Sequence, residues 1–212
     1  MTRSISQFGL ALGAAPAVTV ALTLAAPAAA EFAVNGDFET GDTSGWVSFP
    51  TANSTFDAIT DNPFAGTYAG RIFNDDPASA AVVKQANLGI GDIGPGEELI
   101  VSFYGRGSGE AGGVQFAEFF SELDGGGVSK AEILGGAPLF LGEAWDFYTF
   151  NVVTGPDVSG GVTLQFTATT GGATGSVAET VIDNVSITRV PEPASAALLG
   201  LGVATLALRR RR

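Results

Sequence analysis

The chain has 212 residues, with 22 Asp and Glu against 10 Lys and Arg, and a net charge of −12. It contains no His and no Cys, which excludes Ser-His-Asp and Cys-His catalytic sets, histidine zinc sites and disulfide bonds. Residues 31–189 hold 21 of the acidic and five of the basic residues, a net charge of −16 without any basic stripe. Such a surface repels phosphate backbones, so we expect no nucleic-acid partner.

The first thirty residues are typical of a secretory signal peptide. A single early cation, Arg3, is followed by an apolar stretch without charge that ends in Ala28-Ala29-Ala30. Small residues at this spacing are what signal peptidase requires, so we predict cleavage after Ala30 and a mature chain that begins at Glu31. A membrane anchor is the alternative, but glycine and proline interrupt the apolar run. We expect this segment to be helical.

Residues 31–189 are predicted to form one all-β domain, a β-sandwich. About 160 residues are enough for one core and too few for two comfortable ones. Short runs rich in Val, Ile, Phe, Tyr and Thr alternate with clusters of Gly, Asp, Asn and Pro, and no segment between them has helical periodicity with caps. The predicted strands are Trp46–Phe49, Thr55–Ile59, Tyr68–Phe73, Ala81–Leu88, Glu98–Tyr104, Val114–Leu123, Val128–Leu134, Phe147–Val153, Val162–Thr169 and Thr180–Thr188.

Two of these strands should form a hairpin. Val114–Leu123 is followed by Asp124-Gly125-Gly126-Gly127 and then by Val128–Leu134, and glycine supplies the positive φ that a tight reversal needs. Both faces of the first strand are apolar, so we predict that Phe116, Phe119 and Phe120 all lie in the sandwich interior. The clearest alternation in the chain places Val162, Leu164, Phe166 and Ala168 inward, and Thr163, Gln165, Thr167 and Thr169 outward.

The sequence offers little for catalysis. Carboxylate pairs could serve glycoside hydrolysis, because Asp and Glu are abundant. Pairs such as Asp75-Asp76 and Glu97-Glu98, however, occur in turn-like contexts and are predicted to be solvated. The glycine clusters Gly91–Gly96 and Gly105–Gly109 precede no helix, so we interpret them as loops rather than phosphate-binding turns. We therefore predict that the protein is not an enzyme.

The last 23 residues form a distinct tripartite segment. Pro191-Glu192-Pro193 precedes the apolar run 194–208, which would span about 22 Å as a helix and is shorter than the roughly 20 residues that cross a bilayer. The chain then ends in a cationic block that can interact with anionic headgroups and act as a cytoplasmic stop. The two prolines keep the preceding segment extended, as a processing enzyme would need. The block consists of Arg209, Arg210, Arg211 and Arg212.

This segment resembles the PEP-CTERM sorting signal of exported proteins in Gram-negative, exopolysaccharide-producing bacteria. The resemblance implies that a membrane-embedded, transpeptidase-like exosortase recognises the tail and cleaves near Pro191-Glu192-Pro193. It also implies that the chain contacts the membrane through a short hydrophobic helix before processing. An ordinary C-terminal anchor that is never cleaved is the alternative.

A second resemblance covers the mature domain. Asn35-Gly36-Asp37-Phe38-Glu39-Thr40-Gly41 followed by Gly45-Trp46 is similar to the opening of galactose-binding-like jelly-roll domains, the fold of many carbohydrate-binding modules. The segment 181–187, Val-Ile-Asp-Asn-Val-Ser-Ile, is similar to their closing strand. Residues 66–70 and 96–104 occupy the places of two further family strands, although Leu99 or Ile100 replaces the usual aromatic residue. The resemblance implies a jelly roll, and it specifies fold more than ligand.

The same resemblance implies a structural calcium ion, with Glu39 and Asp183 as side-chain ligands. Asp183 shares its predicted strand face with Val181, Val185 and Ile187, where a lone carboxylate is costly unless a positive or hydrogen-bonding group meets it. The alternative is that Asp183 pairs with Arg71, Arg106 or a set of backbone amides. Asp37 is a weaker candidate ligand.

Carbohydrate modules stack sugar rings on exposed aromatic side chains. The candidates in this chain are Trp46, Tyr68 and Trp145, drawn from a pool that also includes Tyr104 and Tyr148. Trp46 follows the family's Gly-Trp pattern, which is usually a packing position, and Trp145 precedes the apolar start of a strand.

These inferences give three segments: a signal peptide at 1–30, a β-sandwich at 31–189 and a sorting segment at 190–212. We expect an exported protein of the cell envelope or extracellular matrix that binds or organises exopolysaccharide. A non-binding surface spacer is the main alternative, and a glycan hydrolase is a less favoured one.

Overall fold

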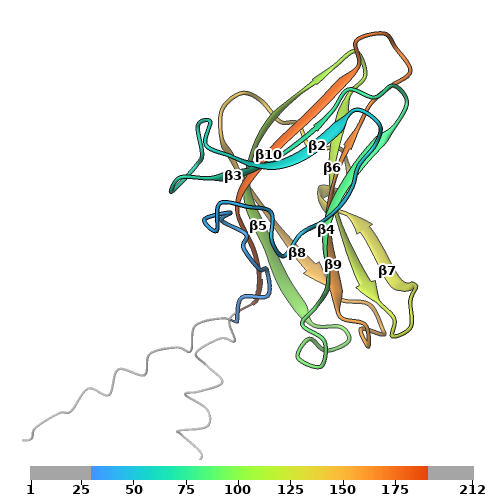
Figure 1. Ribbon diagram of the computed structural model, residues 1–212. Coiled ribbons are helices and arrows are strands. Elements are labelled where there is room, and N and C mark those ends of the chain that lie inside the picture. The colour runs from blue at the N-terminus through green and yellow to red at the C-terminus, as the bar shows by residue number, and fades with distance from the viewer. Residues whose placement is uncertain (1–29, 191–212) are drawn as a thin grey trace, which may run out of the picture.

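The computed structural model describes residues 30–190, which fold into a jelly-roll β-sandwich (Figure 1). Within this range the chain forms strands and a single 3₁₀ turn, and the fold class predicted from sequence is confirmed. The predicted flanking helices, and with them the signal peptide and the sorting segment, lie outside the described residues. The elements are β1 (Val47–Phe49), β2 (Ser54–Ile59), β3 (Ala69–Asn74), β4 (Ala80–Leu88), β5 (Glu98–Glu110), β6 (Val114–Glu122), β7 (Val128–Ile133), η1 (Leu134–Gly136), β8 (Asp146–Val153), β9 (Val162–Thr169) and β10 (Val177–Arg189).

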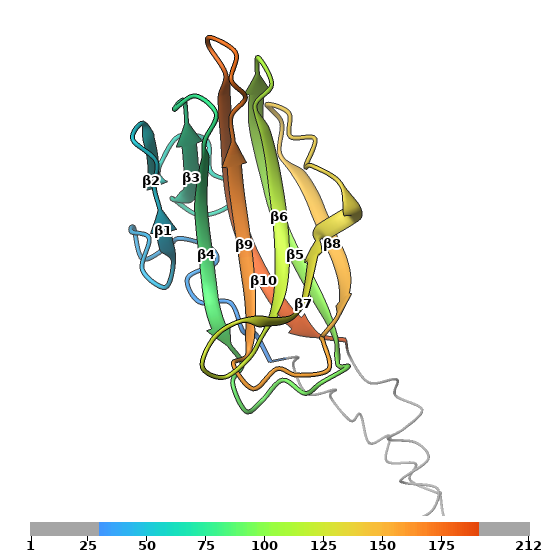
Figure 2. The ribbon, with the colours of Figure 1, turned by 90° about the vertical axis from the view of Figure 1, so that its right-hand side faces the viewer.

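The strands form two antiparallel sheets of five, named here after their middle strands. The β9 sheet has the order β1-β4-β9-β6-β7, and the β10 sheet has the order β2-β3-β10-β5-β8. Figure 2 shows the β9 sheet in front of the β10 sheet, with its outer face toward the viewer. Non-consecutive neighbours in both sheets mean that the chain crosses repeatedly between them, as in a jelly roll.

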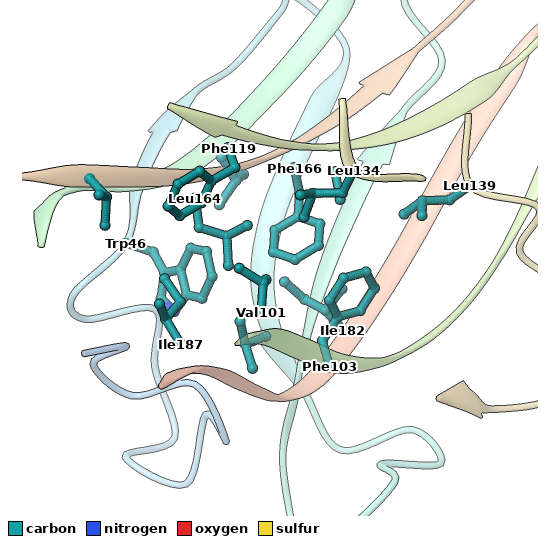
Figure 3. Packing of buried hydrophobic residues seen from close by; sticks show 14 of the residues in the cluster. Trp46, Val101, Phe103, Phe119, Leu134, Leu139, Leu164, Phe166, Ile182 and Ile187 are labelled. Atoms are coloured by element: carbon teal, nitrogen blue, oxygen red, sulfur yellow. The ribbon is translucent and has the colours of Figure 1, made fainter. Parts of the chain in front are cut away.

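The core lies between the sheets and uses one side of each strand. Phe119, Leu164 and Phe166 of the β9 sheet face Val101, Phe103 and Ile182 of the β10 sheet (Figure 3). Phe103 and Phe166 meet edge to face with their ring centroids 4.9 Å apart. Each fully buried side chain of this size contributes about 1.5–3 kcal/mol, which explains how a chain segment without disulfides holds together. The predicted inward set on β9, Val162, Leu164, Phe166 and Ala168, is buried as expected.

The predicted hairpin is also confirmed, because β6 pairs with β7 and Leu123 N donates to Gly127 O at 2.9 Å. One loop interpretation is wrong, since β5 continues through Gly105–Gly109 to Glu110. The reason is steric: a Cβ on Gly107 would overlap the backbone carbonyl oxygen of Glu179 on β10. Glycine here permits close strand approach rather than a turn.

The opening motif packs against the closing strand. Val185 N donates to Gly36 O at 2.9 Å, and Glu31 forms an isolated bridge with Thr188. Residues 30 and 190 therefore lie at the same end of the sandwich, at the bottom of Figure 2. Within residues 30–190 no helix is long and apolar enough to cross a membrane.

Candidate functional site

Glu39 and Asp183 hold the same loop, which connects β2 to β3. Glu39 Oε1 accepts hydrogen bonds from the backbone N–H groups of Thr67 (2.8 Å) and Tyr68 (2.9 Å). Asp183 Oδ2 accepts from Phe64 N at 3.0 Å and Ala65 N at 3.1 Å. The two residues suggested by the family resemblance thus act on one loop from two places in the chain, 144 residues apart in sequence.

Asp183 is fully buried, at 0% exposure. Its Oδ1 accepts a third bond from Asn184 N at 2.7 Å, so three backbone amides, and neither arginine, meet its carboxylate. Burial raises the pKa of Asp183, and the nearby negative charge of Glu39 raises it further, while the three amides act in the opposite direction.

The expected shared face of Asp183 with Val185 and Ile187 is wrong. The pairing of β10 with β5 shifts between Asp183 and Ser186, and Asn184 has a φ of 48°. This β-bulge turns Val185 and Ile187 into the core, whereas Asp183 lies on the other side of the strand beneath the β2–β3 loop.

These two carboxylates fit a divalent cation in part. Neither forms an ion pair within residues 30–190, and Glu39 Oε2 accepts no hydrogen bond from that part of the chain. The described residues contain no group of three or more acidic side chains that could hold a metal ion. Calcium at this place would therefore need backbone carbonyl oxygens and water to complete its six to eight ligands. Asp37 instead closes a local turn, with its Oδ1 accepting from Glu39 N at 3.3 Å.

Of the aromatic candidates, Trp46 is a core residue and offers no ring face to a sugar. It is 8% exposed and stacks on Phe38 with ring centroids 5.7 Å apart. Its ring centroid lies 6.0 Å from that of Phe166. The prediction of Trp46 as a sugar-stacking residue is wrong for this reason. Tyr68 is half-buried against the core, with its backbone N–H bound to Glu39.

Trp145 lies in a small aromatic cluster outside the β10 sheet. Its Nε1 donates to Asn62 O at 3.0 Å, and the Arg106 guanidinium lies 5.3 Å from its ring centroid. Phe64, 39% exposed, contacts Trp145 edge to face and stacks on Tyr104. The indole N–H of Trp145 therefore already has a hydrogen-bond acceptor, and its ring already contacts Arg106 and Phe64.

The outer face of the β9 sheet carries a set of side chains that was not singled out from sequence. Strand register places Lys84 of β4, Gln165 of β9 and Glu118 of β6 in one row across the sheet. The next row runs from Phe49 through Val82 and Thr167 to Phe116. Apolar rings and hydrogen-bonding groups therefore alternate over the middle of this face.

The polar row is organised by its own hydrogen bonds. Glu118 Oε2 accepts from Gln165 Nε2 at 2.7 Å and from Thr167 Oγ1 at 2.8 Å. Lys84 Nζ lies 5.3 Å from the ring centroid of Phe49, which is 50% exposed. Thr163 is 1% exposed, and its hydroxyl has no hydrogen-bond partner. The hydrogen bonds fix the side chains of the row, and the half-exposed ring of Phe49 and the partly exposed Lys84, Gln165 and Glu118 remain accessible to a ligand, whereas Thr163 is covered.

Two residues of this face overturn the sequence interpretation. Phe116 and Phe120 were expected in the interior with Phe119, but only Phe119 points inward, and the other two are half-buried on the outer face. Strict alternation along β6 would have shown this, because residues 116, 118 and 120 share one side. The alternation of β9 likewise placed Gln165 and Thr167 outward, which is confirmed by their register with β6.

A cavity of about 320 Å³ lies at one end of the same face. It is formed by residues at the end of β4, in the turn of the β6–β7 hairpin and just before β9. These segments lie at the bottom of Figure 2. Its lining residues are Lys84, Ala86, Asn87, Ile90, Glu122, Leu123, Asp124, Gly125, Gly126 and Gly160.

Comparison with known proteins identifies the C-terminal segment. Residues 189–212 match the model of the PEP-CTERM protein-sorting motif. This motif indicates a protein exported to the cell envelope and implies processing by an exosortase. No curated protein matches the chain in sequence.

Solved structures match the sandwich. The CBM22-1 xylan-binding domain of Xyn10C from Paenibacillus barcinonensis has 13% identity and a TM-score of 0.54, over 74% of this chain and 94% of that domain. A family 16 carbohydrate-binding module has 14% identity and a TM-score of 0.51, over 74% and 99%. The enzymatically active domain of tailspike protein 4 from bacteriophage CBA120 has 17% identity and a TM-score of 0.58, over 75% of this chain, which spans only 21% of the tailspike chain. The protein is therefore a jelly-roll β-sandwich of the kind that carbohydrate-binding modules adopt, and it ends in a PEP-CTERM protein-sorting motif.

Proposed function

We propose that the protein is a non-enzymatic, polysaccharide-binding component of the cell envelope or extracellular matrix, and that it binds through the outer face of the β9 sheet. The observation that carries this proposal is the planar row of Lys84, Gln165 and Glu118, flanked by the rings of Phe49 and Phe116. Sugars are recognised by aromatic rings that pack on their apolar faces and by fixed polar groups that bond their hydroxyls. This face offers both.

The geometry also favours a chain over a single sugar. Adjacent strands lie about 4.8 Å apart, so a row that crosses β4, β9 and β6 extends over roughly 10 Å. Two sugar units of a polymer could contact such a row at once. Phe120, which is half-buried on β6 beside the buried Thr163 of β9, extends the contact surface further along the face.

The sorting segment supports the location. We propose that an exosortase of a Gram-negative host cleaves the chain near Pro191-Glu192-Pro193 after signal peptidase has cut behind Ala30, and that the sandwich is retained at the outer surface or in the exopolysaccharide matrix. Mass spectrometry of the native protein should then show a chain that begins at Glu31 and lacks Arg209–Arg212. Recovery of the intact C-terminus from envelope fractions would contradict this.

We further propose that Glu39 and Asp183 hold a structural calcium ion beside the β2–β3 loop. Two carboxylates without an ion-pair partner in the described part of the chain support it, and a cation would offset their mutual repulsion. When bound, calcium supplies charge neutralisation and ties the opening motif to β10. It has no role in the sugar-binding face on the opposite sheet.

Affinity electrophoresis of the sandwich, residues 31–190, through gels that contain different polysaccharides tests the binding proposal. The core is built from residues within this range, so the fragment should fold independently. We expect retardation by at least one polysaccharide, with a weak dissociation constant between about 1 µM and 1 mM.

The replacement Phe49→Ala should abolish the retardation, because it removes an exposed ring from the face. The matched control is Phe140→Ala, which deletes a ring that is 84% exposed and belongs to the segment between η1 and β8 rather than to β1, β4, β9 or β6. Absence of retardation in every gel would instead support the spacer function, and equal loss in both variants would refute the assigned surface.

A further inference from the structure

The cavity at the end of the β9 sheet continues the proposed binding face. Lys84 and Ala86 of β4 line the cavity and lie on the outer face of the sheet. Glu122 follows Phe120 at the end of β6, on the same side of the strand. A polysaccharide that crosses the face would therefore reach the cavity with its next units.

Acidic side chains outnumber basic ones in the lining of the cavity. Glu122 and Asp124 contribute carboxylates, and neither forms an ion pair within residues 30–190. Lys84 is the basic residue in the lining, but its ammonium group is drawn toward the ring of Phe49. Because Phe49 pairs with Val82, which precedes Lys84 on β4, this direction leads away from the cavity. The cavity itself is thus electronegative.

An unused polar group lies beside the cavity. Thr163 faces outward on β9, between Phe120 of β6 and the segment of β4 that includes Ala86. Its hydroxyl is buried without a hydrogen-bond partner. Neighbouring side chains cover this hydroxyl and it does not line the cavity, so Thr163 supports the floor of the face, and the cavity contacts a ligand through its own lining residues.

We propose that this cavity binds an ammonium-bearing sugar, and that the polysaccharide is a partly deacetylated polymer of amino sugars. The inference rests on the proposed function of the β9 face and deepens it by naming the ligand class. A protonated 2-amino group in the cavity would meet the Glu122 and Asp124 carboxylates, while the neighbouring units lie along the polar row. Asn87 supplies a neutral amide in the same lining.

The charge of the whole domain favours the same ligand class. Residues 31–189 carry a net charge of −16, so they attract a polycation and repel a uronic acid polymer. This attraction acts over about 10 Å at 0.1 M ionic strength and weakens as salt increases. A neutral glycan would experience neither effect.

The test compares three matched oligosaccharide series at about pH 6, where an amine with a pKa near 8 is protonated. The series are glucosamine oligomers, N-acetylglucosamine oligomers and galacturonic acid oligomers, titrated calorimetrically into residues 31–190. We expect the glucosamine series to bind at least about tenfold more tightly than the acetylated one at low salt, with most of the advantage lost at high salt. Equal or tighter binding of either other series would overturn the inference, and so would the absence of glucosamine binding.

Variants locate the effect. Each exposed carboxylate–ammonium pair is worth up to about fivefold in affinity, so Glu122→Gln with Asp124→Asn should reduce glucosamine binding about tenfold and leave acetylated oligomers unaffected. The matched control, Glu110→Gln with Asp75→Asn, removes two exposed charges outside the cavity lining and should change affinity less than twofold. Equal losses in both double variants would show that only net charge matters and would refute the cavity. Binding of a neutral glucan without any preference for glucosamine would refute this inference while leaving the proposed function intact.

Discussion

Replacing Asp183 by alanine removes the acceptor of three backbone hydrogen bonds at once. Two of them hold the β2–β3 loop through Phe64 and Ala65, and the third stabilises the bulge at Asn184. The carboxylate is completely buried, so the three amides would lose their partner without direct replacement by solvent. Glu39 would remain as the second attachment of the loop.

The expected loss of stability is the difference between the cost of the missing hydrogen bonds and the relief from burying a carboxylate. An unpaired buried amide costs about 1–3 kcal/mol, and a hydrogen bond to a charged group contributes about 1.5–3 kcal/mol. Phe64 and Ala65 belong to an exposed loop that can move toward water, and removal of the carboxylate also relieves its burial and its repulsion by Glu39. We therefore expect Asp183→Ala to lower the free energy of unfolding by about 2–4 kcal/mol at neutral pH.

For a domain of this size, that loss corresponds to a decrease in melting temperature of about 5–15 °C. Differential scanning calorimetry and urea titration of residues 31–190 would measure it. Asp75→Ala serves as the control, because this exposed carboxylate should contribute less than about 0.5 kcal/mol. A loss below about 0.5 kcal/mol in Asp183→Ala would refute the view that this residue fixes the loop.

Three further predictions concern the same region. The pKa of Asp183 is raised in the folded state, so its ionisation destabilises the metal-free fold. The wild type should therefore lose stability relative to Asp183→Asn as pH rises from about 4 toward 7, and parallel stability curves for the two proteins would contradict this. Calcium at a hundredfold excess over its dissociation constant should stabilise wild type by about 2.7 kcal/mol and Glu39→Gln far less, and identical melting in calcium and chelator would argue against the ion. Gly66→Ala should cost about 1–3 kcal/mol in urea titrations, because φ is 63° and the new Cβ would displace the Glu39 carboxylate; an unchanged midpoint would refute that contact.

Most of the fold could be predicted from local pattern. All ten strands were expected within a few residues of their observed bounds, except that β5 was predicted to end at Tyr104. Period-two alternation and turn residues were sufficient for the others. The extension of β5 depends on Gly107 approaching β10, a long-range contact that neighbouring residues cannot reveal.

The binding face was harder to predict, because its two rows are assembled from β1, β4, β9 and β6. Lys84, Gln165 and Glu118 are unremarkable in sequence and become a row only through strand pairing. Phe116 and Phe120 were misassigned because an apolar residue on either side of a strand looks like core. The aromatic type of Trp46 suggested a ligand contact, yet its position beside Phe38 makes it structural.

The position of Asp183 illustrates the same limit. The family resemblance identified Asp183 and Glu39 as partners, and both do act on one loop. Strand alternation alone gave the wrong face for Val185 and Ile187, because the bulge at Asn184 depends on backbone geometry that the residue pattern does not encode.

Chemical-shift mapping of the bound polysaccharide tests the central claim most directly. Titration of isotope-labelled residues 31–190 with the best-binding oligosaccharide should move the amide signals of β4, β9 and β6 most, with Lys84, Gln165 and Glu118 at the centre of the affected region. Signals around Trp145 and the β2–β3 loop should stay in place. Shifts concentrated at Trp145 and Phe64, with the β9 sheet unaffected, would contradict the account and transfer the binding site to the opposite sheet.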